Sequence, residues 1–345
     1  MNNQKPQITV LMSVYNGEKY VVDAIESVLS QTFIDFEFLI FEDCSKDNSL
    51  AILQEYAKKD SRINLIANET NQGLTANLIE GMNIAKGTYL ARMDADDICY
   101  PERLLKQVTY LNQHQEISLL GSSVIFFDDN GYEFVGYQPL EHDEIKVELL
   151  LGYTMMHPSV MMRLNDFRKH NLNYDVSFRY SQDYDLWVRA IRTLKFSNLR
   201  EPLLKMREHA SKISRTVKPE QKTLSDRVRG WQLQELGIEL STEQLRVFNA
   251  RGSMINEKIN HDVELFEQVL IEIIESNKVK PVFNENLLKS SSALRFRNLC
   301  REKMMAGERL GLYYWKSDLK KYDKSDIKSD LGLVYRSLKS FFISN

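Results

Sequence analysis

Short apolar runs alternate with amphipathic segments through the first hundred residues, and this alternation constrains the fold more than any other feature. The apolar runs cover residues 8–14, 36–41, 63–66 and 89–93. The segments between them place apolar side chains at helical spacing, over residues 18–30, 48–59 and 74–85. Strands and helices joined by short connections are typical of right-handed βαβ units. The sequence therefore predicts an α/β fold with a mostly parallel sheet flanked by helices.

Polar turns follow each of the four predicted strands, at residues 13–16, 43–45, 71–73 and 94–97. The carboxyl ends of parallel strands lie at one edge of a sheet, and ligands of such sheets bind there. We therefore expect the four turns to converge on one cleft.

The pattern changes after Pro101. Helices are predicted over residues 101–113, 142–151 and 183–194, and strands over 117–127, 132–137 and 160–163. We expect this second region to complete the sheet and form the far wall of the cleft. From about residue 218 the sequence is helical and highly charged. We therefore expect three parts, with boundaries near residues 112 and 217.

The bulk properties are those of an ordinary globular protein. The 345 residues are 43% hydrophobic and carry a net charge of −3, which gives no basic surface for nucleic acid. Three widely separated cysteines give neither a disulfide framework nor a zinc spacing. The first seven residues lack a secretory pattern, and no apolar run approaches the roughly 18 residues of a membrane span. We expect a cytoplasmic protein, with peripheral membrane contact left open.

Three carboxylates, Asp94, Asp96 and Asp97, lie within four residues at the end of the fourth predicted strand. Such a charge density is unfavourable unless a cation or hydrogen-bond donors compensate it. Mg²⁺ and Mn²⁺ take one or two protein carboxylates and fill their other positions with water and phosphate oxygens. The position favours a metal site that neutralises a diphosphate leaving group. The alternative is an acidic helix cap, since Asp97 precedes the helix expected near Pro101.

Two residues suggest that the ligand contains a nucleobase. Asp43 ends the second predicted strand, where its carboxylate could accept a hydrogen bond from the uracil imide N–H. Tyr15 ends the first strand and could stack on a base. The alternatives are a loop cap for Asp43 and plain packing for Tyr15.

These strand ends carry motifs in a fixed order: ITVLMSVYNG at residues 8–17, SVLSQTF at 27–33, EDCSKDNS at 42–49, NQGL at 71–74 and RMDADD at 92–97. Later segments add HPS at 157–159, QDYDLWVR at 182–189, EPL at 201–203 and REH at 207–209. The ordered set, over about residues 7–215, resembles the family 2 inverting glycosyltransferases. These have the GT-A (Rossmann-like) fold, and the type resembled is that of bacterial polysaccharide, O-antigen or capsule synthesis.

The resemblance implies metal-dependent transfer of a hexosyl or N-acetylhexosaminyl group from a nucleotide-sugar. The donor is expected to be a UDP-sugar, and the acceptor a hydroxyl of a glycan or lipid-linked saccharide in cell-surface polysaccharide synthesis. Residues 1–112 would be the nucleotide-sugar-binding half of the GT-A domain, 113–217 the acceptor-binding half, and 218–345 a helical C-terminal region.

The resemblance also implies roles for individual residues. Those expected to bind the nucleotide are Ser13, Tyr15, Glu18, Asp43, Gly73, Asp94 and Ala95. Asp96 would ligate Mn²⁺ or Mg²⁺, with His209 as a further candidate ligand. Those expected near the donor sugar or acceptor are Arg92, Asp97, His157, Gln182 and Trp187.

Asp183 matches the general base of the inverting members. An inverting transfer needs a carboxylate that takes the acceptor hydroxyl's proton as its oxygen attacks the anomeric carbon. The family more often has glutamate at the position of Gln182, which could alter the pKa of the base or an acceptor contact. The alternative for Asp183 is a helix N-cap. Asp185, two positions on, is the weaker candidate for the base.

Three further residues have ordinary alternatives. His209 could be an exposed loop histidine, and His157 could make only a structural hydrogen bond. Arg207 could pair with a phosphate, but a solvated surface charge is the default interpretation.

Other classes of protein remain to be weighed against this one. Processive family members usually have membrane helices and a Gln-x-x-Arg-Trp motif, neither of which is present, so we expect single additions. A nucleotidyltransferase would usually carry a basic, glycine-rich loop after the first strand, unlike residues 15–18. A non-catalytic nucleotide-sugar-binding scaffold is the third alternative. The C-terminal region, with a basic-aromatic end at residues 332–342, could form a homodimer, cover the acceptor site or contact a membrane.

Overall fold

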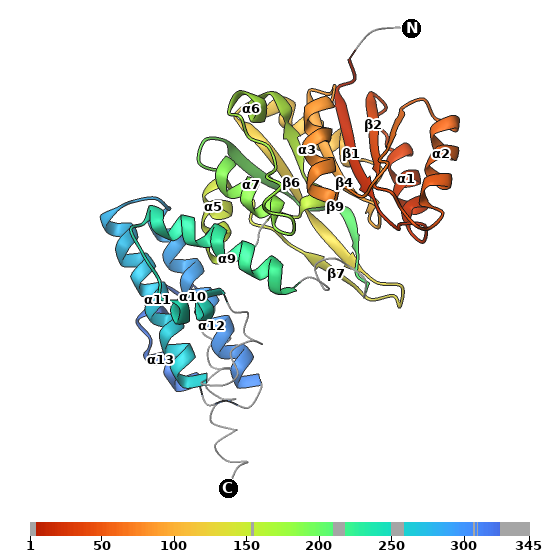
Figure 1. Cartoon of the computed structure of the whole chain (residues 1–345). Helices are drawn as coiled ribbons and strands as arrows, with labels where there is room; N and C mark the ends of the chain where they lie inside the picture. The colour runs from red at the N-terminus through yellow and green to blue at the C-terminus, as the bar shows by residue number, and fades with distance from the viewer. Residues whose placement is uncertain are drawn as a thin grey trace. The chain divides into compact units, whose positions relative to one another are not determined.

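The computed structural model describes residues 5–152, 155–209, 218–249, 259–305, 308 and 310–324. The chain divides into two compact units (Figure 1). The first comprises Met1–Ile145 and Tyr153–Ser225, and the second comprises Lys146–Gly152 and Asp226–Asn345.

The described strands of the first unit form one nine-stranded sheet in the order β3-β2-β1-β4-β8-β6-β9-β5, with β7 paired to β6. The strands are β1 (Ile8–Val14), β2 (Phe36–Glu42), β3 (Ile63–Ala67), β4 (Tyr89–Asp94), β5 (Ile98–Cys99), β6 (Ile117–Phe127), β7 (Glu133–Gly136), β8 (Met161–Arg163) and β9 (Lys195–Arg207). Helices α1 (Val21–Leu29), α2 (Ser49–Lys59), α3 (Leu74–Ile84) and α4 (Arg103–Gln113) connect its first strands. This is the GT-A arrangement, as expected.

The first four strands are parallel to one another, as the sequence predicts. β1 lies between β2 and β4, and β2 pairs with β3. β1 is buried along nearly its whole length, which is why its residues form a continuous apolar run. Helix α1 packs its apolar face, including Ala24, Ile25 and Val28, into the same core.

The second half of the sheet is mixed rather than parallel. β8 pairs antiparallel with both β4 and β6, whereas β6 and β9 are parallel. The remaining elements of this half are α5 (His142–Leu151), the 3₁₀ turn η1 (His157–Ser159), α6 (Leu164–Lys169) and α7 (Gln182–Ala190). Helix α7 thus ends four residues before the predicted end. Because the sheet continues through both halves, the boundary near residue 112 stays a prediction.

The second unit is helical in its described part, as expected for the C-terminal region. Its helices are the C-terminal part of α9 (Lys218–Glu235), α10 (Thr242–Asn249), α11 (Ile259–Val279), α12 (Glu285–Met305) and α13 (Gly311–Lys316), with the 3₁₀ turn η3 (Asp318–Tyr322). Their apolar faces form a separate core that includes Phe248, Phe266 and Phe296. The basic-aromatic end at residues 332–342 lies outside the described residues.

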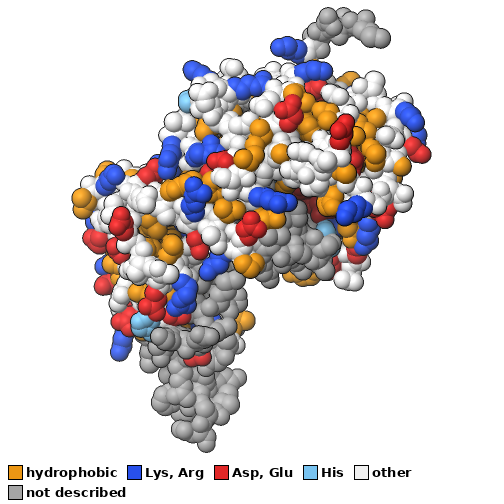
Figure 2. All heavy atoms as spheres, viewed as in Figure 1, with side chains coloured by type: hydrophobic (Ala, Val, Ile, Leu, Met, Phe, Trp, Pro, Cys, Tyr) orange, Lys and Arg blue, Asp and Glu red, His pale blue; other side chains and the backbone are white. Residues whose placement is uncertain are grey.

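Two surface properties bear on function. On the face shown in Figure 2, acidic and basic side chains are interspersed, in keeping with the net charge of −3. No helix in the described ranges is both long and apolar enough to cross a membrane.

Candidate functional site

The carboxyl ends of β1, β2 and β4 lie side by side. Ser13 pairs in register with Asp94 on β4 and with Phe41 on β2. The Ser13 hydroxyl accepts a hydrogen bond from Asn77 Nδ2 on α3 at 2.9 Å. Three of the polar turns predicted to converge therefore do so, and α3 braces the first of them.

Asp43 ties the third turn to this edge. Its carboxylate is buried and accepts hydrogen bonds from the backbone N–H groups of Gln72 and Gly73, at 2.8 and 2.9 Å, and from Asn68 Nδ2. Gly73 has a φ of 85°, which glycine adopts at little cost. Asp43 thus caps the loop at residues 71–73, which is the alternative given for it above. Its contact with uracil stays a prediction.

The first two turns interlock. Glu18 accepts hydrogen bonds from the backbone N–H and side-chain amide of Asn48, both at 2.9 Å. Ser49 Oγ accepts from the Gly17 N–H at 2.8 Å. The ring of Tyr15 at this turn is exposed rather than packed in the core, so it is available to a ligand.

Asp94 forms an ion pair with a buried arginine, Arg92. The Arg92 guanidinium is fully buried and forms an ion pair with the Asp94 carboxylate, which is half-buried. Burial acts to lower the pKa of Arg92, but attraction to Asp94 outweighs it and raises the pKa. Arg92 therefore stays charged and orients Asp94. In this structure it has almost no surface with which to touch a sugar directly.

The three aspartates have different surroundings, although their carboxylate oxygens lie within 4.8 Å of one another. Asp97 is 0% exposed and accepts a hydrogen bond from the Arg207 backbone N–H at 3.0 Å. The helix-cap alternative for Asp97 is wrong, because Glu102 precedes α4. Its burial also leaves no surface for the predicted donor-sugar or acceptor contact. Asp97 instead fixes the end of β9 to the aspartate turn.

Asp96 faces the open side of the turn together with His209. His209 Nε2 lies 2.8 Å from Asp96 Oδ2, and both side chains are partly exposed. Ala95, between Asp94 and Asp96, is also half-buried. Asp94 is paired with Arg92, and Asp97 is buried against the Arg207 N–H. The partly exposed Asp96 and His209 are therefore the residues that could most readily hold a divalent metal, with phosphate oxygens and water in its other positions.

Arg207 joins this turn to three other elements, and the default interpretation of it as a solvated surface charge is wrong. Its buried guanidinium donates from Nε to the Asp96 carbonyl at 3.2 Å. It also pairs with Asp129 at 2.7 Å and with Asp23 at 3.0 Å. The guanidinium lies between the rings of Tyr20 and Phe127, at 4.4 and 4.6 Å from their centroids.

Helix α7, which carries Asp183, forms the second wall of the candidate site, since Asp183 and Asp94 both act on the pKa of the Tyr174 hydroxyl. Ser181 is the N-cap residue of this helix, so the N-cap alternative for Asp183 is wrong. Asp183 is half-buried, whereas its neighbours Gln182 and Tyr184 are buried. Asp185 is buried and paired with Arg189, which gives it a structural role.

Tyr174 lies between the two walls. Burial raises the pKa of its phenol, Arg92 lowers it, and Asp183 and Asp94 raise it further, so both carboxylates act on one hydroxyl. Tyr174 Oη lies 2.8 Å from His157 Nε2. Burial and the nearby Arg92 together hold the pKa of His157 well below its usual range, so the imidazole is neutral. The predictions from the sequence did not include Tyr174, since it stands outside every motif.

Trp187 and His157 are core residues in this structure. The Trp187 ring is fully buried, with edge-on contacts to His157 and Phe196. Trp187 therefore supports His157 and has no surface for the predicted acceptor contact.

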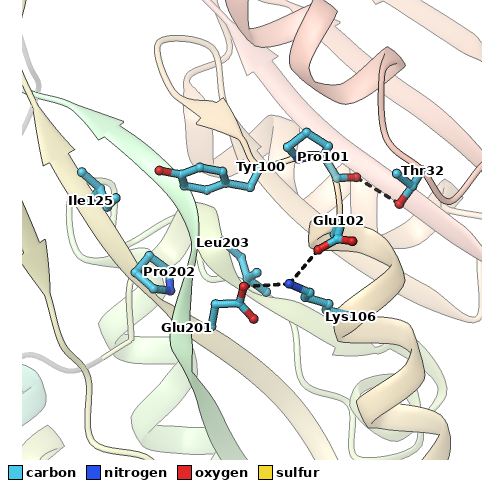
Figure 3. A pocket seen from close by; sticks show the side chains of 9 residues that line it. All are labelled: Thr32, Tyr100, Pro101, Glu102, Lys106, Ile125, Glu201, Pro202 and Leu203. Atoms are coloured by element: carbon cyan, nitrogen blue, oxygen red, sulfur yellow. Dashed lines mark hydrogen bonds and ion pairs between the residues drawn. The ribbon is translucent and has the colours of Figure 1, made fainter.

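A surface cavity of about 560 Å³ lies elsewhere on the first unit (Figure 3). It is lined by Thr32, Tyr100, Pro101, Glu102, Lys106, Ile125, Glu201, Pro202 and Leu203. Its one lysine, Lys106, is paired with Glu102 and Glu201 at 2.8 and 2.7 Å. Since none of the predicted site residues lines it, this cavity is separate from the candidate site.

Comparison with known proteins identifies the family of this chain. Residues 9–184 match the family model described as glycosyl transferase family 2. The chain is 42% identical over 209 residues to an uncharacterized glycosyltransferase of Methanocaldococcus jannaschii, covering 59% of this chain and 71% of that protein. It is 32% identical over 206 residues to the O-antigen biosynthesis glycosyltransferase WbnJ of Escherichia coli, covering 59% of this chain and 80% of that protein.

Among solved structures, the fold is similar to that of Staphylococcus aureus TarS residues 1–349 in complex with UDP. The TM-score is 0.56 at 18% identity, and the match covers 87% of this chain and 91% of that one. The sheet with an acidic turn at its carboxyl edge is therefore that of a glycosyltransferase. The chain is a member of glycosyl transferase family 2.

Proposed function

We propose that this glycosyltransferase uses a UDP-sugar and a divalent metal, and transfers the sugar with inversion to a hydroxyl of a glycan or lipid-linked saccharide. The observation that carries the proposal is the pairing of Asp96 with His209 at one wall of a site whose other wall presents Asp183. We propose residues 1–112 as the half that binds the nucleotide-sugar and residues 113–217 as the half that binds the acceptor. The sugar transferred would be a hexose or an N-acetylhexosamine.

The donor half would bind the nucleotide along the edge formed by Ser13, Tyr15 and Gly73. The exposed ring of Tyr15 offers a stacking surface for a base. Asp94, held by buried Arg92, would accept hydrogen bonds from the ribose hydroxyls. The UDP bound to TarS, whose fold is similar, supports this choice of nucleotide.

Asp96 and His209 would hold Mn²⁺ or Mg²⁺, whose charge stabilises the diphosphate as it leaves. The chain's own contribution is to fix those two ligands. Arg207 donates to the Asp96 carbonyl, and Asp97 accepts from the Arg207 backbone, so the turn and the end of β9 are joined. His209 lies two residues beyond Arg207 and is positioned by the same join.

Asp183 would act as the general base. It would take the proton of the acceptor hydroxyl as that oxygen forms a bond to the anomeric carbon. The bond between that carbon and the β-phosphate oxygen breaks on the opposite face, and UDP leaves with the bonding electrons. One glycosidic bond forms and one sugar-phosphate bond breaks, with inversion at the anomeric carbon.

We place the acceptor in cell-surface polysaccharide synthesis, which the name of the Escherichia coli relative supports. The enzyme would work in the cytoplasm, at the inner face of the membrane when its acceptor is lipid-linked. The helical C-terminal region is the candidate for a membrane or dimer contact.

Metal-dependent turnover tests this proposal. Wild-type protein is incubated with UDP-, GDP- and dTDP-sugars with and without Mn²⁺, and both nucleotide release and thermal stabilisation are measured. We expect stabilisation and slow hydrolysis with a UDP-sugar and Mn²⁺, and loss of both in Asp96→Ala. Asp35→Ala, which changes an exposed aspartate just before β2, is the matched control.

Tight UDP binding without transfer or hydrolysis in wild type would favour the non-catalytic scaffold. Release of pyrophosphate from a nucleoside triphosphate and a sugar phosphate would favour the nucleotidyltransferase. Stabilisation by GDP-sugars but not by UDP-sugars would contradict the predicted contact between Asp43 and uracil.

A further inference from the structure

The β6–β7 hairpin carries an exposed aromatic row. Phe126 on β6 pairs in register with Phe134 on β7. Their rings stack, with centroids 4.7 Å apart and an interplanar angle of 14°. The ring of Tyr132 lies beside Phe134, at 5.6 Å between centroids. Tyr132 is 60% exposed and Phe134 is 44% exposed. We call these three residues the hairpin aromatic row.

The local backbone is shaped to hold this row. A Cβ added at Gly136 would lie 2.5 Å from the Phe126 ring, so a side chain at this position would displace the ring from β7. Asp128 Oδ1 accepts from the backbone N–H groups of Asn130 and Tyr132, at 2.9 and 3.0 Å, and so fixes the turn that leads into Tyr132. Among the described strands, β7 pairs with β6 alone.

The turn end of the hairpin is attached to the candidate site. Asp129 pairs with Arg207, whose Nε donates to the Asp96 carbonyl. The Glu208 N–H donates to the Phe127 carbonyl at 2.7 Å, one residue before His209. The turn that leads into the aromatic row is therefore joined to the segment that carries Arg207 and His209.

We propose that the hairpin aromatic row binds the acceptor saccharide by stacking neutral sugar rings on Phe134 and Tyr132. This inference rests on the proposed function. The face of a pyranose that carries axial C–H groups is apolar and slightly positive, whereas the face of an aromatic ring is negative. Stacking buries both apolar surfaces, and the nearby carboxylates can accept hydrogen bonds from sugar hydroxyls.

The charges around the row favour a saccharide over an anionic lipid surface. Residues 128–136 contain three acidic residues, Asp128, Asp129 and Glu133, and no lysine or arginine. The neighbouring Lys19 and Lys205 are already paired with Asp129 and Glu133. An anionic leaflet attracts surfaces rich in basic residues, and this surface offers it little net positive charge.

Saturation-transfer NMR on the full-length protein tests the proposal, with chitotriose, cellotriose and maltotriose as probes. We expect at least one trisaccharide to receive saturation from the wild-type protein. We expect the variant Tyr132→Ala/Phe134→Ala to bind it about tenfold more weakly, since two stacking surfaces are lost. Phe134→Tyr should retain binding. Tyr137→Ala is the matched control, because Tyr137 is 67% exposed just beyond β7 and outside the row.

The proposal would be overturned by no saturation transfer from wild type to any of the trisaccharides, or by unchanged binding in the double variant. Loss of vesicle binding or of self-association in the double variant, with trisaccharide binding intact, would also overturn it. The outcome is separate from that of the proposed function, which is judged by UDP-sugar hydrolysis. If the protein hydrolyses a UDP-sugar but the double variant binds trisaccharides as wild type does, this inference alone fails. If trisaccharide binding depends on the aromatic row but no UDP-sugar is hydrolysed, the proposed function alone fails.

Discussion

Replacing Arg207 by alanine should damage both the stability of the first unit and its metal site. The guanidinium is buried between two aromatic rings and donates to the Asp96 carbonyl. Two desolvated cation–π contacts contribute about 1 kcal/mol each, and a hydrogen bond from a charged donor about 1.5 kcal/mol. The ion pairs to Asp23 and Asp129 add little, because both carboxylates are about half exposed.

The free energy of unfolding should therefore fall by about 3.5 kcal/mol. For a unit of this size that lowers Tm by roughly 7 to 14 °C. Because the same side chain holds the backbone of Asp96, Mn²⁺-dependent hydrolysis of a UDP-sugar should also fall, by about a hundredfold at a temperature where the variant is folded.

Calorimetry and a nucleotide-release assay measure the two effects. Arg207→Lys should recover part of the stability but little of the activity, because the compact ammonium of lysine cannot span the Asp96 carbonyl and both carboxylates that the wider guanidinium reaches. Arg200→Ala, which changes an exposed arginine on the same strand, is the control. A variant that loses stability but keeps full Mn²⁺-dependent activity would refute the reasoning that Arg207 positions Asp96.

Three further substitutions probe other parts of the site. Asp183→Asn should lower the rate of sugar transfer about a thousandfold, while UDP binding stays unchanged. Transfer by this variant near the wild-type rate would rule out Asp183 as the general base. Gly73→Ala should lower the free energy of unfolding by about 1 kcal/mol, because the φ of 85° at this position is strained for alanine. The variant should also bind UDP more weakly, and an unchanged melting curve would argue against the strain. His157 is neutral in the folded state, with its pKa below the ordinary 6.5, so the unfolded state binds the extra proton as pH falls. Stability contributed by this histidine is thus present above about pH 6.5 and lost below it. His157→Gln should flatten the decline of Tm between about pH 7 and 5, and an equally steep decline would contradict the assignment.

The parallel half of the sheet could be predicted almost residue by residue. Its strands are buried on both faces, so the apolar run itself marks where β1, β2 and β4 begin and end. β9 was not predicted, because Glu201 and Pro202 interrupt its pattern where the register with β6 shifts. A bulge with a charged residue and a proline resembles a loop when only the sequence is read.

The site was predictable to the extent that its residues stand in local motifs. The position of the aspartate turn follows from the strand before it, and the location of Asp183 from the helix after it. The residues that these side chains contact could not be predicted from the sequence. Arg207 bonds to Asp96 and Asp97 across more than a hundred residues of sequence, and Tyr174 reaches His157 from outside every motif. Burial of Arg207 depends on which rings and carboxylates the fold brings to it, and no local spacing encodes that.

The join between Arg207 and the aspartate turn also determines when the site can form during synthesis. The hydrogen bond from the Arg207 N–H to Asp97 spans 110 positions in the chain. A ribosome that has released only the first four strands has produced the aspartates but not the segment that fixes them or supplies His209. The nascent parallel half therefore has no finished metal site, and a fragment ending before β9 should show no Mn²⁺-dependent stabilisation. The proposed metal site can therefore form only after β9 has been synthesised.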